Sequence, residues 1–476
     1  MSEPVSPEDW LAALRVLHAA LDETAAPLPD RAELERLACR LAKAARKKRR
    51  SSPPSSEEAE ERGLQSTEAR AQAAAHDRAL LAGTAMQRTH LTGTGIPGKG
   101  GQLRGPSRGC HICGADFREI DALYHRLCPP CAAENRRRRE QSADLSGRVA
   151  LVTGGRIKIG RATALRLLRL GARVLVTTRF PHDAAQRFAE EPDFEVWRGR
   201  LEIHGLDFLD PRSVLAFAAG LEKTLPCLDI LINNAAQTVK RPDSFYAPAL
   251  ARQLQPLPPA AAALLGGGGV ERTSTGTGEL AESETVPATA TAPWESVTLT
   301  AWPGVLDRHG LPPDPRDHNS WTLRAHEVPP GELLEVLLVN AAAPAFLVSA
   351  LKPLLLRSPH PDRFIVNATG TDGRFGVPSK PSAHPHINMG KAALNMLTCT
   401  AAADYAADRI HMNSVDTGWV SDESGHATRE ARAAAGWTPP LDMADAAARL
   451  CAPVLDGITG EPYSGLLLRH YHPASW

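Results

Sequence analysis

One stretch decides the fold of this 476-residue chain: Val149-Ala150-Leu151-Val152-Thr153-Gly154-Gly155-Arg156-Ile157-Lys158-Ile159-Gly160. Residues 149–153 read as a buried strand, the glycines as a tight turn, and residues 161–170 as a helix. A turn of this kind aims backbone N–H groups and the positive end of a helix at a diphosphate. The stretch therefore predicts a nucleotide-binding site in an α/β domain.

The next strand carries a second signal about the nucleotide. Residues 172–178 read as an apolar strand that ends on two hydroxyl side chains, and Arg179 follows it. A protein that prefers NAD has an acidic residue at this place, where it binds the ribose hydroxyls. A guanidinium favours the 2′-phosphate of NADP instead. The sequence therefore predicts NADP(H) as the cofactor.

The rest of the domain follows the same alternation. From Ser146 onward, apolar strands alternate with amphipathic helices, which is the pattern of a parallel α/β sheet. An insertion at about 238–330 lies on the side where such sheets bind ligands and could form a substrate lid. We expect its low-complexity middle, about 258–292, to be disordered. Its ordered half should contain the large side chains that would otherwise be exposed: Trp294, Trp302, Leu311 and Trp321.

Residues 146–476 resemble the short-chain dehydrogenase/reductase family in several segments. The glycine stretch matches the family's TGxxxGxG motif, with Lys158 in place of the middle glycine, as in some NADP-dependent relatives. The other matching segments are Asp207-Phe208 at the adenine, Asn233-Asn234-Ala235-Ala236 for the NNAG motif, the active-site Asn340, and Val415–Val420 beside the nicotinamide. The resemblance implies a Rossmann-type doubly wound parallel sheet and an NADP(H)-dependent oxidoreductase.

The cofactor-binding residues follow from the glycine turn, from Arg179 and from this resemblance. We expect them to be Gly154, Arg156, Ile157, Lys158, Ile159, Gly160, Thr178, Arg179, Asp207, Phe208, Asn234, Ala235, Ala236, Lys391, Gly418 and Val420.

The family's catalytic residues are only partly present. Lys391 and Asn340 match it, but Ile387 stands where the family has its proton-donating Tyr, and Gly370 where it has a Ser. An imidazole can act as a general acid near pH 7, so a nearby histidine is a candidate replacement. A polar loop packed around the cofactor is an equally good interpretation of these histidines. The candidate catalytic residues are Lys391, Asn340, His386 and Thr369, with His384 as second proton donor and Asn388 as a hydrogen-bond donor.

Three interpretations of these departures stay open. The proton donor has moved, or the hydride acceptor is an activated double bond or imine that water protonates, or the protein binds NADP(H) without catalysis. We favour an oxidoreductase that reduces a carbonyl, imine or activated double bond of an unidentified small molecule. The alternative is an inactive NADP(H)-binding sensor or scaffold whose zinc module recruits a protein or nucleic-acid partner.

Four cysteines precede the α/β domain in two pairs, Cys110-x2-Cys113 and Cys128-x2-Cys131. Each pair can present two thiolates from a tight turn, and two such turns complete a tetrahedral shell, so we predict one structural Zn2+. Unligated or redox-active thiols are the alternative. The basic run Arg136–Arg139 follows at once; we favour a solvated helix end over a nucleic-acid contact.

The chain before the cysteines divides into two parts. Residues 1–50 are predicted to be a helical segment, since residues 7–50 read as two helices with apolar residues at helical spacing. Residues 51–107 read as a largely disordered linker, residues 108–140 as the four-cysteine zinc module, and residues 146–476 as the dehydrogenase-like domain. The N-terminal part is not needed for that domain, so we expect it to serve binding or assembly with a protein partner.

Composition excludes some classes of partner. Lys+Arg and Asp+Glu both total 54, so the net charge of zero excludes a globally basic or acidic binding mode. No apolar run approaches a membrane span, and the first residues do not resemble a signal peptide, so we expect a cytoplasmic protein without a membrane contact. The family resemblance implies a homodimer or homotetramer, joined through the helix that carries Lys391 and the helix near 336–348.

Overall fold

The computed structural model describes residues 67–92, 98–266, 306–307, 309–316, 318–377 and 380–476. The helices predicted over 7–50, most of the insertion's middle, Trp294 and Trp302 lie outside these residues. Residues 71–376 and 381–476 form one compact unit, which contains both the cysteine pairs and the dinucleotide-type fold.

The unit is built on an eight-stranded sheet with the order β12-β11-β10-β9-β8-β5-β6-β7. All neighbouring pairs are parallel except β11 and β12, which are antiparallel. The strands are β5 (Val149–Thr153), β6 (Arg173–Thr178), β7 (Leu201–Gly205), β8 (Ile230–Asn233), β9 (Arg363–Thr369), β10 (Ile410–Asp416), β11 (Leu467–Arg469) and β12 (His472–Ala474). The predicted Rossmann-type doubly wound sheet is confirmed.

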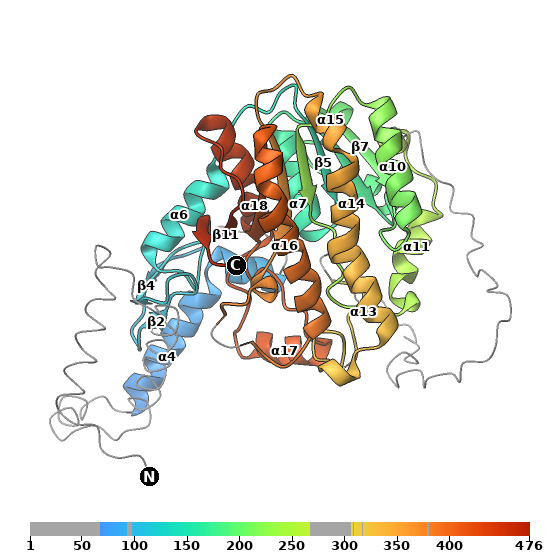
Figure 1. The fold of residues 1–476 in the computed structure, drawn as a ribbon. Coiled ribbons are helices and arrows are strands. Elements are labelled where there is room, and N and C mark those ends of the chain that lie inside the picture. Colours follow the sequence, from blue (N-terminus) through green and yellow to red (C-terminus); the bar gives the residue numbers. More distant parts are fainter. Residues whose placement is uncertain (1–66, 93–97, 267–305, 308, 317, 378–379) are drawn as a thin grey trace, which may run out of the picture. The chain divides into compact units, whose positions relative to one another are not determined.

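Helices cover both faces of this sheet (Figure 1). Along β5, Ala150 and Val152 face one hydrophobic core, while Val149 and Leu151 face the other, because successive strand residues point to opposite faces. The first core is closed by α7 (Lys158–Arg169), α8 (Pro181–Ala189) and α18 (Met443–Thr459). The second is closed by α10 (Pro211–Thr224), α14 (Ala343–Ala350) and α16 (Pro385–Ala407).

Further helices of this domain lie around this framework. They are α9 (Phe194–Trp197), α11 (Ala247–Gln253), α12 (Pro259–Ala262), α13 (Pro330–Leu337), α15 (Lys352–Leu356) and α17 (His426–Ala434). One helical stretch in the described part of the chain, Pro330–Ala350, is long and apolar enough to cross a membrane by length and composition alone. It comprises α13, a π-turn at Leu338–Ala342 and α14, and it packs against α10 and α16 beside the sheet.

The predicted disorder over 51–107 is wrong for residues 67–92 and 98–107. The former make up α4 (Thr67–Ala82) and α5 (Ala85–Thr92), and the latter include β1 (Gly101–Gln102), which pairs with β4 (Glu119–Ile120). Leu80, Leu81 and Met86 pack into a core that also contains Cys110 and Cys128. The helices are stabilised by this packing, which the weak periodicity of the segment did not reveal.

The insertion is also more ordered near its start than predicted. Within the predicted disordered middle, α12 is helical, and Ala261 and Leu264 are buried against the sheet. The Ile203 N–H of β7 donates a 2.7 Å hydrogen bond to the Leu264 carbonyl, and Gly266 donates one back to Ile203. Backbone pairing with a strand more than 50 positions earlier therefore orders residues 258–266.

The basic run lies at the end of a helix, as predicted; Arg137 is exposed, whereas Arg138 and Arg139 are partly buried. It belongs to α6 (Pro129–Glu140), and each of its arginines is paired with a carboxylate of the chain. Arg138 lies 2.6 Å from Asp456, and Arg139 lies 2.7 Å from Asp442, both in the C-terminal part. The run therefore joins the cysteine module to α18, and its charge is compensated inside the molecule.

Candidate functional site

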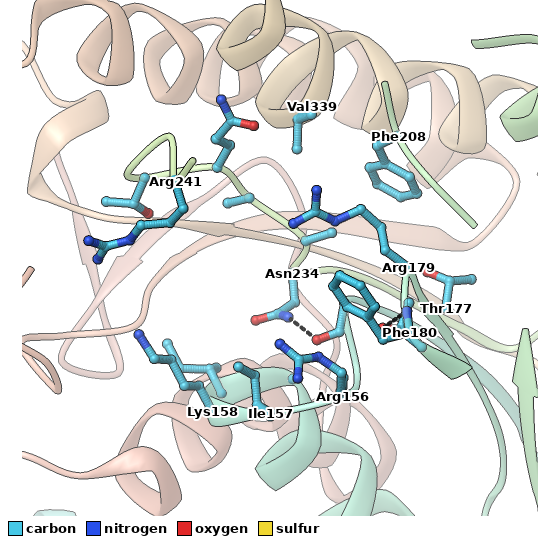
Figure 2. Close-up of a pocket in the computed structure, with 18 of the residues that line it drawn as sticks. Arg156, Ile157, Lys158, Thr177, Arg179, Phe180, Phe208, Asn234, Arg241 and Val339 are labelled. Atoms are coloured by element: carbon cyan, nitrogen blue, oxygen red, sulfur yellow. Dashed lines mark hydrogen bonds between the residues drawn. The ribbon is translucent and has the colours of Figure 1, made fainter. Parts of the chain in front are cut away.

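A pocket of about 400 Å3 opens at the carboxyl ends of β5, β6 and β8. The chain reverses its winding direction between β5 and β8, and this is where doubly wound sheets bind ligands. The structure brings together most of the predicted cofactor residues along its wall (Figure 2): Gly154, Arg156, Ile157, Lys158, Ile159, Gly160, Thr178, Arg179, Asp207, Phe208, Asn234, Ala235 and Ala236. Lys391, Gly418 and Val420 are not among the lining residues.

The glycine turn can adopt its shape only because it lacks side chains at two points. Gly154 has a φ of +70°, in the left-handed region that favours glycine. A Cβ at Gly160 would lie 2.2 Å from the Gly154 carbonyl oxygen. The Asn234 side-chain amide donates a 2.9 Å hydrogen bond to the Thr153 carbonyl and so holds β8 to the turn. The start of α7 is thereby left open to the pocket.

Positive side chains outnumber negative ones along the pocket. Arg156, Lys158, Arg179 and Arg241 line it, against Asp207 and Glu423. The Arg179 guanidinium lies 4.6 Å from the centre of the Tyr246 ring, which stacks on Phe180. The pocket is therefore suited to a ligand with several anionic groups and an aromatic base.

Arg156 is held in place from behind the pocket. Its guanidinium pairs with Asp183, a fully buried carboxylate of α8. Arg187 and Arg252 pair with the same carboxylate. One negative charge thus faces three guanidinium groups, and this side of the pocket keeps an excess of positive charge.

Lys391 lies under the carboxyl end of β9. Its ammonium donates a 2.8 Å hydrogen bond to the Ala368 carbonyl. Burial lowers the pKa of Lys391 to about 8, and the nearby Asp372 carboxylate opposes that shift. Asn340 lies in the π-turn, where its side chain accepts a hydrogen bond from the Gln237 N–H at 2.7 Å and donates one to the Gln237 carbonyl at 3.0 Å.

The two histidines predicted as proton donors have different surroundings. His386 is fully buried, and its Nε2 lies 3.2 Å from Glu332 of α13, so it points at that carboxylate. His384 instead caps α16 with a φ of +45° and stacks on Trp321, with ring centres 4.1 Å apart. Its Nδ1 donates to the Trp321 carbonyl at 2.9 Å, because a carbonyl can only accept.

His384 therefore turns its second ring nitrogen toward Asp372, with Nε2 3.7 Å from Oδ1. Asp372 is also the carboxylate that acts on Lys391. His384 is the N-cap of α16, and Lys391 lies in the second turn of the same helix. The geometry favours His384 over His386 as a group that can deliver a proton near Lys391.

The remaining residues predicted for the catalytic and nicotinamide positions have the following surroundings. The Thr369 hydroxyl is buried without a hydrogen-bond partner in the described part of the chain. Ile387 is buried at the place where the family has Tyr. Gly418 packs beside Arg449, and Val420 is buried in the core of the cysteine module.

The four cysteines converge as predicted, with their Sγ atoms within 4.8 Å of one another. Arg126 makes no ion pair with any described carboxylate. A metal held by four thiolates carries excess negative charge, so the convergence of the thiols and a nearby cation without a carboxylate partner fit a metal centre at this cluster.

Sequence reasoning missed two groups of the site. Arg241 comes from the insertion, and Glu423 comes from the segment just after Val420. The insertion was known to lie at the ligand end of the sheet, and the basic pair Lys240-Arg241 near its start was an available signal. Nothing local marks Glu423, because its cationic partners, Lys158 and Arg241, are more than 100 positions away.

Comparison with known proteins gives two family-model matches. Residues 148–254 match the model described as short chain dehydrogenase, and residues 318–464 match the one described as Enoyl-(Acyl carrier protein) reductase. The unmatched residues between them fall in the insertion.

Individual relatives are similar over different lengths. The chain is 28% identical over 363 residues to uncharacterized protein R665 of Acanthamoeba polyphaga mimivirus, covering 73% of this chain and 71% of that protein. It is 40% identical over 102 residues to mouse retinol dehydrogenase 14, which is 19% of this chain and 30% of that protein. The NADPH-bound carbonyl reductase from chicken fatty liver is 19% identical with a TM-score of 0.44, covering 70% of this chain and all of that one.

Proposed function

Since the chain belongs to the short-chain dehydrogenase/reductase family of NAD(P)-dependent oxidoreductases, we propose that it is an NADP(H)-dependent reductase of a small molecule. The substrate class is a carbonyl, an imine or an activated carbon–carbon double bond. The observation that carries this proposal is the pocket at the switch point of the sheet, with the glycine turn, Arg156, Lys158 and Arg179 along one wall.

The pocket residues have distinct roles in this proposal. The N–H groups at the start of α7 bind the diphosphate, and Arg179 binds the 2′-phosphate, with Arg156 beside it. Asn234 holds the glycine turn against β8. When bound, NADPH supplies the hydride, and the protein aligns the acceptor and provides a proton.

We assign proton donation to His384. Stacking on Trp321 fixes its ring plane, and because Nδ1 is engaged by the Trp321 carbonyl, Nε2 is the nitrogen that would carry the transferable proton. Asp372 lies where it can accept from the protonated ring, and the same carboxylate acts on Lys391. His384 would thus supply the proton that the family's Tyr donates and that Ile387, which stands in its place, cannot donate.

A second candidate function is supported by the residues that differ from the family's catalytic pattern. Ile387 and Gly370 remove the hydroxyl groups that the family uses, and His386 is engaged by Glu332. A protein that binds NADP(H) as a sensor or scaffold would keep the pocket without a proton donor. In that case the cysteine module would report cofactor binding to a partner.

We also propose a structural Zn2+ at Cys110, Cys113, Cys128 and Cys131. Its role would be to stabilise the core that contains Val420, Leu441 and Ala446 of the C-terminal segment. That core also touches Ile159 and Met443, which line the dinucleotide pocket. The metal would thus support one wall of the pocket.

The remaining parts of the proposal concern location and assembly. A cytoplasmic homodimer or homotetramer fits the apolar side chains that α13 and α16 expose, among them Leu334, Met389 and Met396. Nucleic acid and membrane are not proposed as partners, because the basic run is compensated within the chain. A protein partner for the N-terminal region remains part of the second candidate function.

The deciding experiment follows NADPH absorbance with a panel of aldehydes, ketones, imines and enones. His384→Ala should lower turnover about 100- to 10,000-fold without changing NADPH affinity, which is typical for loss of a general acid. His386→Ala is the matched control on the same turn and should retain turnover if it folds. Full activity in His384→Ala would remove this residue from the mechanism, and absence of turnover with every acceptor would favour the sensor.

A further inference from the structure

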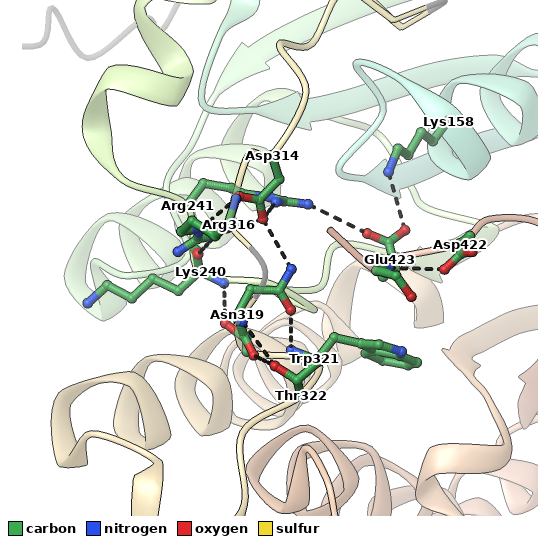
Figure 3. Close-up of polar contacts among 12 residues, drawn as sticks. Lys158, Lys240, Arg241, Asp314, Arg316, Asn319, Trp321, Thr322, Asp422 and Glu423 are labelled. Carbon is green, nitrogen blue, oxygen red and sulfur yellow. Dashed lines mark hydrogen bonds and ion pairs between the residues drawn. The ribbon is translucent and has the colours of Figure 1, made fainter. Parts of the chain in front are cut away.

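Glu423 lies in the wall of the dinucleotide pocket between two of its cations. Its carboxylate is 3.4 Å from the Lys158 ammonium and 4.0 Å from the Arg241 guanidinium. The Ser421 hydroxyl donates a 2.9 Å hydrogen bond to the same carboxylate. All four residues line the pocket, and Figure 3 shows the contacts to Lys158 and Arg241.

We propose that Lys158 and Arg241 form a phosphate-binding pair for the dinucleotide, and that Glu423 is a built-in competitor for this pair. The diphosphate and the Glu423 carboxylate exchange places, so the affinity for the dinucleotide is set below what the cations alone would give. This inference rests on the proposed dinucleotide function and adds Arg241 and Glu423 to its binding residues.

Lys158 is placed for this role by the backbone. It is the first residue of α7, with a φ of +53°, at the helix end where N–H groups point into the pocket. An anion that binds these N–H groups comes within reach of the Lys158 ammonium as well. The N–H groups of α7 and the Lys158 ammonium would therefore bind the same phosphate group.

Arg241 is placed by side chains of the insertion. One end of its guanidinium pairs with the buried carboxylate of Asp314. Asp314 is itself fixed by Arg316 at 2.8 Å and by the Asn319 amide at 3.1 Å. The other end of the Arg241 guanidinium faces Glu423 and the pocket, as Figure 3 shows.

The competition follows from the charges. Lys158, and then Arg241, outweigh burial and lower the pKa of Glu423 to about 2, so the carboxylate is ionised at all physiological pH values. A diphosphate brings further negative charge to the same two cations. The diphosphate and the Glu423 carboxylate are both negative and would repel each other in a partly buried site. They therefore cannot both bind Lys158 and Arg241 at full strength.

A purely structural role for Glu423 predicts the opposite result. If the carboxylate only anchored its loop, then removing its charge would loosen the pocket and weaken dinucleotide binding. If it competes with phosphate, removing its charge strengthens binding. The sign of the change in affinity therefore separates the two.

The experiment measures NADPH affinity by fluorescence titration for the full chain and three variants. Glu423→Gln should bind NADPH about three- to tenfold more tightly, and Arg241→Gln about tenfold more weakly, as expected for charge-assisted contacts. Asp422→Asn is the matched control: Asp422 adjoins Glu423 but pairs with Arg432 at 2.7 Å and does not line the pocket. Its affinity should be unchanged.

Unchanged or weaker NADPH binding by Glu423→Gln overturns the inference while leaving the proposed function intact. If the parent binds no dinucleotide, the proposed function fails. The inference is then tested by adding inorganic pyrophosphate and measuring the melting temperature. Pyrophosphate should raise it more in Glu423→Gln than in the parent or Asp422→Asn, and equal rises overturn the inference. If Arg241→Gln does not fold, Lys158→Gln replaces it, with weaker binding expected.

Discussion

Tyr124 of the cysteine module donates a 2.6 Å hydrogen bond to the carboxylate of Asp445, which lies 321 positions later at the start of α18. Burial raises the pKa of Asp445, and the neighbouring Asp442 adds to this, while Arg139 acts against it at 3.1 Å. The contact shows that the module is packed into the dehydrogenase-like domain. Loss of the Tyr124–Asp445 hydrogen bond should therefore lower the stability of the whole unit.

Tyr124→Phe removes the hydroxyl and leaves the buried Asp445 carboxylate with one donor fewer. The expected loss is about 1–3 kcal/mol in the free energy of unfolding. Urea denaturation followed by tryptophan fluorescence measures it. Tyr405→Phe, which removes a hydrogen bond to the neutral Val348 carbonyl, is the control and should cost less. An unchanged midpoint in Tyr124→Phe would contradict the packing argument.

Metal analysis of the purified protein should give about one zinc per chain. Cys128→Ser should lose it and melt at a lower temperature, because the metal stabilises the core shared with Val420 and Leu441. Cys399→Ser changes an exposed cysteine of α16 and serves as the control. Full zinc content and an unchanged melting curve in Cys128→Ser would exclude this metal site.

The protein should bind NADPH more tightly than NADH. Arg179→Asp should weaken NADPH binding at least about tenfold and leave NADH binding nearly unchanged, because only NADPH offers the 2′-phosphate. Arg173→Gln, at the other end of β6, breaks an exposed pair with Glu202 and should change neither affinity. Equal affinities of the parent for both cofactors would refute the preference.

NADPH affinity should fall as the pH rises through about 8. The pKa of Lys391 is lowered to about 8 by burial, so its ammonium is present below this pH and is lost above it. The family resemblance makes Lys391 one of the expected cofactor-binding residues. Lys391→Arg keeps its charge at high pH and should flatten the profile if it folds. The same decline in Lys391→Arg would assign the pH dependence to another group.

Light scattering at micromolar concentration should give the mass of a dimer or tetramer. Met389 and Met396 lie seven residues apart on α16, about half of each is exposed, and the adjacent α13 exposes Leu334. Met396→Glu places a charge in this apolar surface and should shift the mass toward the monomer. A monomeric parent would refute the assembly.

Much of the fold could be predicted because its signals are local. The strand, glycine turn and helix around Gly154–Gly160 are contiguous, and their conformations depend on steric limits of neighbouring residues. The cysteine pairs are equally local, since each x2 spacing sets up one turn. Such features need no knowledge of what packs on them.

The errors have a common physical cause. Helices α4 and α5 and residues 258–266 show little pattern of their own and are ordered by contacts with distant elements. The surroundings of His384 and His386 could not be predicted either, because their partners Trp321, Asp372 and Glu332 come from three other segments.

The sequence by itself determined the sheet, the glycine turn, the cofactor end of the sheet and the convergence of four cysteines, because each depends on residues close together in the chain. The tertiary structure alone decided that Asp372 faces both His384 and Lys391, that Glu423 meets Lys158 and Arg241, and that α6 is clamped to α18. Electrostatic and packing contacts act through space between segments up to hundreds of positions apart. Their partners are set only when the whole chain has folded.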